Sequence, residues 1–129
     1  MIKQNLPRPT DAELEILRVL WLRGRSTVRE VQDSLNDNKP TGYTTVLKML
    51  QIMTEKGLVQ RDEEQRAHVY QAKLAQAQTQ QQLVGDLLDR AFDGSASSLV
   101  MQALATKKTS AEELTKIRKM LDEFERGGR

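Results

Sequence analysis

The chain has 129 residues, enough for one domain or two small ones, and it contains no cysteine, which excludes a disulfide framework and thiolate metal sites. No apolar run approaches the length of a membrane span, and the N-terminus lacks the apolar core of a signal peptide, so we expect a cytoplasmic protein without membrane insertion. The net charge is only +2, which by itself does not indicate nucleic-acid binding and permits it only if the few cations are well placed.

Two helices are expected near the N-terminus. Thr10-Asp11-Ala12-Glu13 has the spacing of a capping box, in which the threonine oxygen and the glutamate each accept a hydrogen bond from a free backbone amide at the helix start. An apolar run from Leu14 to Trp21 follows, and Gly24 is expected to end this helix. Ser26 is expected to cap a second helix, whose apolar stripe contains Val28, Val31 and Leu35.

The sequence from about Thr41 to Lys56 predicts a third helix with two different faces. Apolar side chains recur at helical spacing and are expected to face a core: Tyr43, Val46, Leu47, Leu50 and Met53. Small hydroxyls and one cation recur on another side: Thr41, Thr44, Thr45 and Lys48. Such a face suits a DNA groove, because threonine hydroxyls reach phosphates, threonine methyls contact thymine, and lysine meets phosphate or guanine. Gly57 then supplies a left-handed residue at the helix end.

Two features of this helix allow a simpler interpretation. Amphipathic helices that carry threonine are usually just solvated on that side, so the hydroxyl face indicates DNA only together with the elements around it. Tyr43 belongs to the apolar stripe by spacing, but it is equally well placed to contact DNA.

A β-hairpin is expected next. Residues 58–61 and 67–72 are prone to form strands, and residues 62–66 form a charged turn between them. Three short helices followed by a hairpin have the order of a winged helix-turn-helix. Arg61 and Arg66 lie where the wing could meet a phosphate backbone, although Arg66 is equally well explained as a solvated turn residue.

The C-terminal part is predicted to be helical. One helix is expected from about Leu74 to Phe92 with a stop at Gly94, Ser97 is expected to cap a short second helix, and a capping box at residues 110–113 begins a third. The expected fold is therefore mostly α with a small β-hairpin. A winged-helix DNA-binding domain occupies residues 1–74, and a helical dimerisation domain occupies residues 75–129.

Dimerisation is expected because 55 residues are too few to bury the apolar stripes of these helices. A two-fold dimer would cover them and would match palindromic DNA, whereas the alternative is that the helices fold back on the N-terminal domain. The residues expected at the interface are Leu83, Leu87, Leu88, Phe92, Leu99, Leu104, Leu114, Ile117, Leu121 and Phe124.

The chain resembles the penicillinase-repressor (BlaI/MecI/CopY) family over nearly its whole length. The resemblance rests on residues 10–17 with Trp21, Tyr43-Thr44-Thr45-Val46 with Leu50, Lys56-Gly57-Leu58-Val59, His68-Val69-Tyr70, Ser98-Leu99-Val100 and Glu112-Glu113-Leu114. It implies a dimeric winged-helix repressor of a palindromic operator in double-stranded DNA. It also implies inactivation by proteolysis through a membrane sensor with a metalloprotease domain. The recognition positions that it implies are Thr41, Tyr43, Thr44, Thr45 and Lys48.

Two departures from the family pattern bear on function. Ile52 stands where members often carry arginine late in the recognition helix, so this chain lacks the side chain for one familiar phosphate or base contact. Gln102-Ala103 stands where β-lactam-responsive members carry an Asn-Phe cleavage pair, so this chain lacks the dipeptide at which those members are cut. The copper-responsive branch uses a C-terminal cysteine cluster, and thiolate copper sensing is excluded because this chain has no cysteine.

An enzyme is not expected. The chain has one histidine, His68, and lacks a Ser/His/Asp arrangement, a metal-ligand cluster and a phosphate-binding glycine loop, so no catalytic residue, metal or cofactor is assigned. The competing functions are a winged-helix ligand-sensing regulator and a protein-interaction module without cleavage-type induction.

Overall fold

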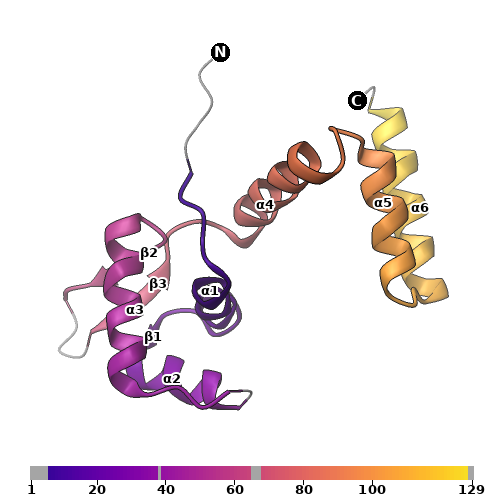
Figure 1. Ribbon diagram of the computed structural model, residues 1–129. Helices are drawn as coiled ribbons and strands as arrows, with labels where there is room; N and C mark the ends of the chain where they lie inside the picture. Colours follow the sequence, from indigo (N-terminus) through magenta and orange to yellow (C-terminus); the bar gives the residue numbers. More distant parts are fainter. Residues whose placement is uncertain (1–5, 38, 65–67, 128–129) are drawn as a thin grey trace. The chain divides into compact units, whose positions relative to one another are not determined.

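The computed structural model of the chain describes residues 6–37, 39–64 and 68–127 (Figure 1). Its backbone contacts divide the chain into two units, Met1–Gly85 and Asp86–Arg129, and the boundary falls inside helix α4 (Gln76–Ala91). No helix in the described ranges is long and apolar enough to cross a membrane. The division of the chain into domains at residues 74 and 75 stays a prediction.

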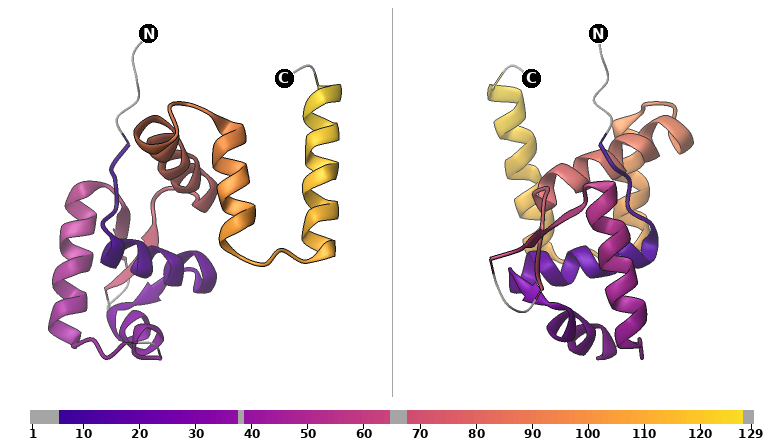
Figure 2. Two further views of the ribbon diagram at one scale, coloured as in Figure 1. Left: turned by 45° about the vertical axis from the view of Figure 1, so that its right-hand side comes forward. Right: turned by 90° about the vertical axis from the view of Figure 1, so that its left-hand side faces the viewer.

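The first unit is a winged helix, built from three helices and a three-stranded antiparallel sheet. The elements are α1 (Asp11–Arg23), β1 (Ser26–Thr27), α2 (Val28–Asn36), α3 (Tyr43–Lys56), β2 (Val59–Asp62) and β3 (Val69–Ala72). Strand β3 lies between β1 and β2, so that Tyr70 faces Ser26 on one side and Arg61 on the other. Figure 2 shows α1, α2 and α3 gathered around this sheet. The predicted fold class is confirmed, and β1 is a strand that the sequence analysis missed.

The predicted capping box of α1 forms, and α2 has a second capping box in place of the predicted cap at Ser26. In α1, the Glu13 amide donates to Thr10 Oγ1 at 3.2 Å and the Thr10 amide donates to Glu13 Oε1 at 2.9 Å. In α2, the cap is Thr27, which makes the same reciprocal pair with Glu30. The assignment of the cap to Ser26 is therefore wrong. Ser26 is instead buried in β1, and its hydroxyl donates to the Gly24 carbonyl.

The core of the first unit joins α1, α2 and α3 to the sheet. It consists of Ile16, Leu17, Leu20, Val28, Val31, Val46, Leu50, Met53, Leu58, Val59 and Tyr70. Tyr43 is 43% exposed, so its interpretation as a core residue is wrong, although helical spacing placed it on the apolar stripe. The buried tyrosine is Tyr70 of the central strand. At the end of α3, Gly57 adopts the expected left-handed conformation with φ of 85°.

A partly buried ion pair joins the start of α1 to the end of α3. Lys56 Nζ lies 2.6 Å from Glu13 Oε1, and the Glu13 side chain is 8% exposed. Burial of the carboxylate acts to raise its pKa. Hydrogen bonds from Lys56 and the Thr10 amide, with the charge of Lys56, outweigh burial and hold the pKa of Glu13 below its ordinary value. The ionised form of Glu13 therefore stabilises the fold of the first unit.

We expect Glu13→Gln to lower the free energy of unfolding by about 1–3 kcal/mol at pH 7, the range for a lost charge-assisted hydrogen bond in a buried site. Because the pKa is lowered on folding, the wild-type contribution is fully present above the ordinary value of 4.5 and is lost as pH falls through the lower folded value. Urea unfolding at pH 7 and at a series of lower pH values measures both effects. Glu15→Gln, at an exposed carboxylate of the same helix, is the control, and equal losses in the two variants would contradict the role given to Glu13.

The first half of α4 belongs to the first unit. Trp21 Nε1 donates to the Leu74 carbonyl at 3.0 Å just before this helix begins. Within the helix, Thr79 is 2% exposed and Gln82 Nε2 donates to the Leu6 carbonyl at 2.9 Å. These contacts fix the direction in which the chain leaves the sheet.

The second unit consists of the end of α4 followed by α5 (Ala96–Thr106) and α6 (Ala111–Arg126). The helices α5 and α6 run in opposite directions (Figure 2). Helix α5 is capped by Ser95, so the assignment of its cap to Ser97 is wrong; the Ser95 hydroxyl reaches the Ser98 amide, as an N-cap must. Ser110 caps α6 as predicted. Within residues 86–127 no residue is buried, and this unit therefore lacks a core of its own.

Candidate nucleic-acid interface

Helix α3 separates its two predicted faces as the sequence requires. Val46, Leu50 and Met53 are fully buried, whereas Thr44, Thr45 and Lys48 are exposed. With 3.6 residues per turn, these exposed positions lie on the side of the helix opposite the core. Within the described ranges Lys48 has no ion-pair partner, so its ammonium group is available to a ligand.

The start of α3 is open to an anion. Its N-cap residue is Gly42, which has no side chain to accept the first backbone amides. The first amide with an intrahelical partner is that of Val46, which donates to the Gly42 carbonyl at 3.1 Å. The amides of Tyr43, Thr44 and Thr45 therefore point outward at the positive end of the helix dipole, next to two exposed hydroxyls. This combination suits a backbone phosphate.

Thr41 does not belong to α3, although the sequence predicted that the helix would begin there. Its backbone amide donates to Asn36 Oδ1 at 2.7 Å, and its carbonyl accepts from Gln32 Nε2 at 3.2 Å. Its hydroxyl donates to the Lys39 carbonyl at 3.1 Å. Thr41 thus shapes the turn between α2 and α3 and is half-buried in it.

Tyr43 has a partner that the sequence analysis missed. The guanidinium of Arg29, from α2, lies over the Tyr43 ring at 5.6 Å from its centroid, a cation–π arrangement. Both side chains are exposed, and they add a cation and a phenol beside the open start of α3. No local pattern could have found this pair, because it depends on how α2 crosses α3.

The wing carries cations that are already paired. Arg61 on β2 donates to Glu63 Oε1 at 2.9 Å, and this hydrogen bond raises the pKa of Arg61. Arg25, which the sequence analysis did not single out, forms an ion pair with Asp62 at the end of the same strand. A phosphate must therefore replace Glu63 before it can engage Arg61 fully. Arg66 lies outside the described residues.

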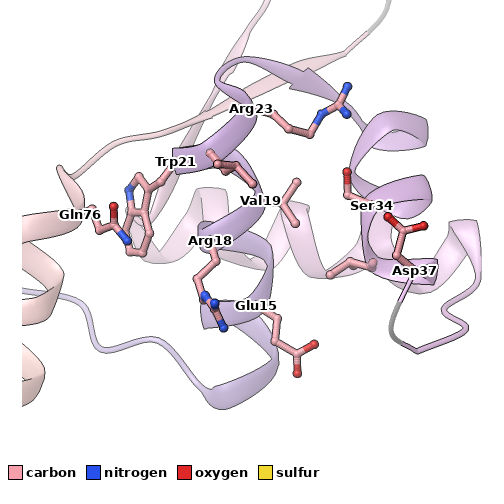
Figure 3. A pocket seen from close by; sticks show the side chains of 10 residues that line it. Glu15, Arg18, Val19, Trp21, Arg23, Ser34, Asp37 and Gln76 are labelled. Carbon is pink, nitrogen blue, oxygen red and sulfur yellow. The ribbon is translucent and has the colours of Figure 1, made fainter. Parts of the chain in front are cut away.

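A separate hollow of about 560 Å³ lies between α1 and α2 (Figure 3). It is lined by Glu15, Arg18, Val19, Trp21, Leu22, Arg23, Ser34, Leu35, Asp37 and Gln76. The volume is in the range of ligand pockets, but the wall carries charges of both signs, and Arg23 is engaged by Glu30 at 3.4 Å. Its arrangement does not indicate any one ligand chemistry.

A model of the family described as penicillinase repressor matches residues 9–123. This chain belongs to the penicillinase repressor family. The match covers both units and confirms the resemblance inferred from the sequence.

Two family relatives extend over nearly the same length. The penicillinase repressor of Bacillus licheniformis is 26% identical over 120 residues, which cover 93% of this chain and 94% of the relative. The transcriptional regulator BlaI of Mycobacterium tuberculosis (strain CDC 1551 / Oshkosh) is 30% identical over 124 residues, 95% of this chain and 89% of the relative.

Two solved structures from this family match the winged-helix part. The solution structure of the DNA-binding domain of the repressor BlaI has a TM-score of 0.50 and 27% identity, and the match covers 58% of this chain and 92% of that domain. The solution structure of monomeric Bacillus licheniformis BlaI in complex with the blaP half-operator has the same TM-score and identity, with coverage of 57% and 89%. In that second structure, a family member of the same fold is bound to half of an operator.

Proposed function

We propose that this chain is a DNA-binding transcriptional repressor that binds a palindromic operator as a dimer. The observation that carries the proposal is the exposed face of α3, where Thr44, Thr45 and Lys48 stand clear of the core beside an open helix start. Family membership supports the same conclusion, since a relative of this fold was solved on a half-operator. The names of the relatives describe repressors and regulators, which supports a function other than catalysis.

The exposed face of α3 provides both kinds of contact that a specific complex needs. The amides at its start and the hydroxyls of Thr44 and Thr45 can hold phosphates and so fix the position of the helix on the duplex. Lys48 lies one turn further along, where a long cation can reach a phosphate or the acceptor atoms of guanine in the major groove. Arg29 and Tyr43 can add a contact at the edge of the groove.

Dimerisation through the C-terminal helices is supported by their exposure. Leu121 is 59% exposed and Phe124 is 64% exposed, and both lie on the apolar stripe of α6. Leu87 of α4 is 48% exposed, and the other proposed interface residues are only half-buried: Leu83, Leu88, Phe92, Leu99, Leu104, Leu114 and Ile117. A second copy of the unit would cover such stripes by isologous pairing. Two recognition helices would then meet the two halves of a palindrome.

Release of the operator by a sensor protease requires a change in α5. Gln102 and Ala103 are exposed, but their peptide bond lies inside a helix, and the Gln102 carbonyl also accepts from Thr106 Oγ1 at 2.6 Å. Proteases bind extended chains, so α5 must unwind before cleavage. The absence of the Asn-Phe pair is a second obstacle to cleavage. We therefore expect a protease specific for Asn-Phe to cut this chain slowly or not at all, as measured by mass spectrometry of the digest. Rapid cleavage between the two residues would contradict this.

The proposal is tested by selecting duplexes from a randomised DNA library with the full-length chain. We expect enrichment of one palindromic sequence and a shifted band in gel electrophoresis that a non-specific duplex does not compete away. If no sequence is enriched, the repressor function is wrong, and the protein-interaction and ligand-sensing alternatives take its place. The neighbouring gene gives an independent observation, because a membrane metalloprotease encoded there would support release by proteolysis.

A further inference from the structure

Ile52 is a large apolar residue that the core of the first unit does not bury. It is 42% exposed and lies outside the hydrophobic cluster of the first unit, although its neighbour Met53 is fully buried. Ile52 follows Lys48 by four residues and Thr45 by seven, so the three side chains form one line along the exposed side of α3. The exposed line thus ends in a branched hydrocarbon side chain.

The chemistry of Ile52 restricts what it could read on DNA. The side chain has no hydrogen-bond donor or acceptor, so it can recognise neither a phosphate nor the polar edge of a base. The one apolar group in the major groove is the 5-methyl of thymine, which contacts apolar side chains in specific complexes. Glu55, exposed one turn further along, marks the end of the DNA-facing surface because phosphates repel its carboxylate.

We propose that Ile52 is a specificity-determining residue that contacts a thymine methyl in each half of the operator. This inference rests on the proposed function. It gives α3 a contact that discriminates thymine from other bases, in addition to the phosphate and lysine contacts. Burial of one methyl group against an apolar side chain is worth about 0.8 kcal/mol, which corresponds to a factor of about four in affinity.

The experiment uses the full-length chain and the palindromic duplex that it selects from the randomised library. Each thymine of that duplex is replaced in turn by deoxyuridine, which differs only by the missing 5-methyl. We expect one thymine per half-site at which the replacement weakens wild-type binding about fourfold. Ile52→Ala should bind the thymine and uracil duplexes with equal affinity.

Leu22→Ala is the matched control, because Leu22 is an exposed apolar residue of α1 that does not belong to the DNA-binding face of α3. It should retain the difference between thymine and uracil. The inference is overturned if no thymine is sensitive to the replacement, if Ile52→Ala keeps the full difference, or if Leu22→Ala abolishes the difference as well. If the protein selects no duplex at all, the proposed DNA-binding function is wrong. This outcome differs from a failure of the thymine contact alone, so the two can be distinguished. Circular dichroism checks folding, which alanine at an exposed helical position should not disturb.

Discussion

Replacing Leu121 by glutamate is expected to convert the proposed dimer into monomers and to lower operator affinity by at least about 100-fold. Leu121 lies on the exposed apolar stripe of α6, where a dimer would bury it, and an unpaired carboxylate there would lose its hydration. When the two copies separate, the second half-site contact is no longer intramolecular, and avidity of about 10²–10⁴ is lost. Analytical ultracentrifugation measures the first effect, and operator titration measures the second.

The Leu121→Glu experiment distinguishes an effect on dimer assembly from an effect on folding. Leu121 is 59% exposed within one chain, so the substitution removes little packing inside the unit, and glutamate is a good helix former. Thr115→Glu introduces the same single negative charge on another side of α6, where the residue is also exposed, and it should remain a dimer of nearly wild-type affinity. A Leu121→Glu variant that stays dimeric would show that α6 does not form the interface. A monomer with unchanged affinity would show that DNA binding does not need the dimer.

The elements that could be predicted from the sequence are those determined by local spacing. The capping box at Thr10 and Glu13, the left-handed Gly57 and the apolar stripe of α3 each depend on residues within one or two helical turns. The error at Ser26 was of the same local kind, since Glu30 stands three residues after Thr27 and so identifies Thr27 as the cap. Strand β1 gave no local signal, because two residues become a strand only through pairing with β3.

The candidate site could be predicted only in part, because some of its contacts join elements that are separate in the sequence. The exposed side of α3 follows from helical periodicity, and so do Thr44, Thr45 and Lys48. The pair of Arg29 with Tyr43 requires α2 and α3 to cross, and the pair of Arg25 with Asp62 requires β2 to come close to the residues before β1. Tyr43 was ambiguous because the stripe continues to the first turn of the helix, where the core no longer covers it. Periodicity thus assigns a side to a residue but does not show where the covering core ends.

Replacing Lys48 by alanine should weaken operator binding without unfolding the protein. Lys48 is exposed opposite the buried Val46, Leu50 and Met53, so its removal leaves the core intact, and alanine favours a helix. If Lys48 contacts a base, the loss should be about 1–3 kcal/mol per half-site, with relaxed preference at one position of the operator. If it contacts a phosphate, all sequences should weaken alike and the slope of log affinity against log salt should fall by roughly one unit per lysine.

Titrations of the selected duplex and of a non-specific duplex across several salt concentrations distinguish the two kinds of contact. Lys119→Ala, at an exposed lysine on the polar side of α6, is the control and should leave both affinity and salt slope unchanged. Thr44→Ala and Thr45→Ala should act more mildly than Lys48→Ala, because each removes a hydroxyl without removing a charge. Wild-type affinity in a folded Lys48→Ala, Thr45→Ala double variant would remove α3 from the DNA interface. Together with unaltered selection of the operator, that outcome would make the wing and the start of α2 the next surfaces to test, because they carry the exposed cations Arg61 and Arg29.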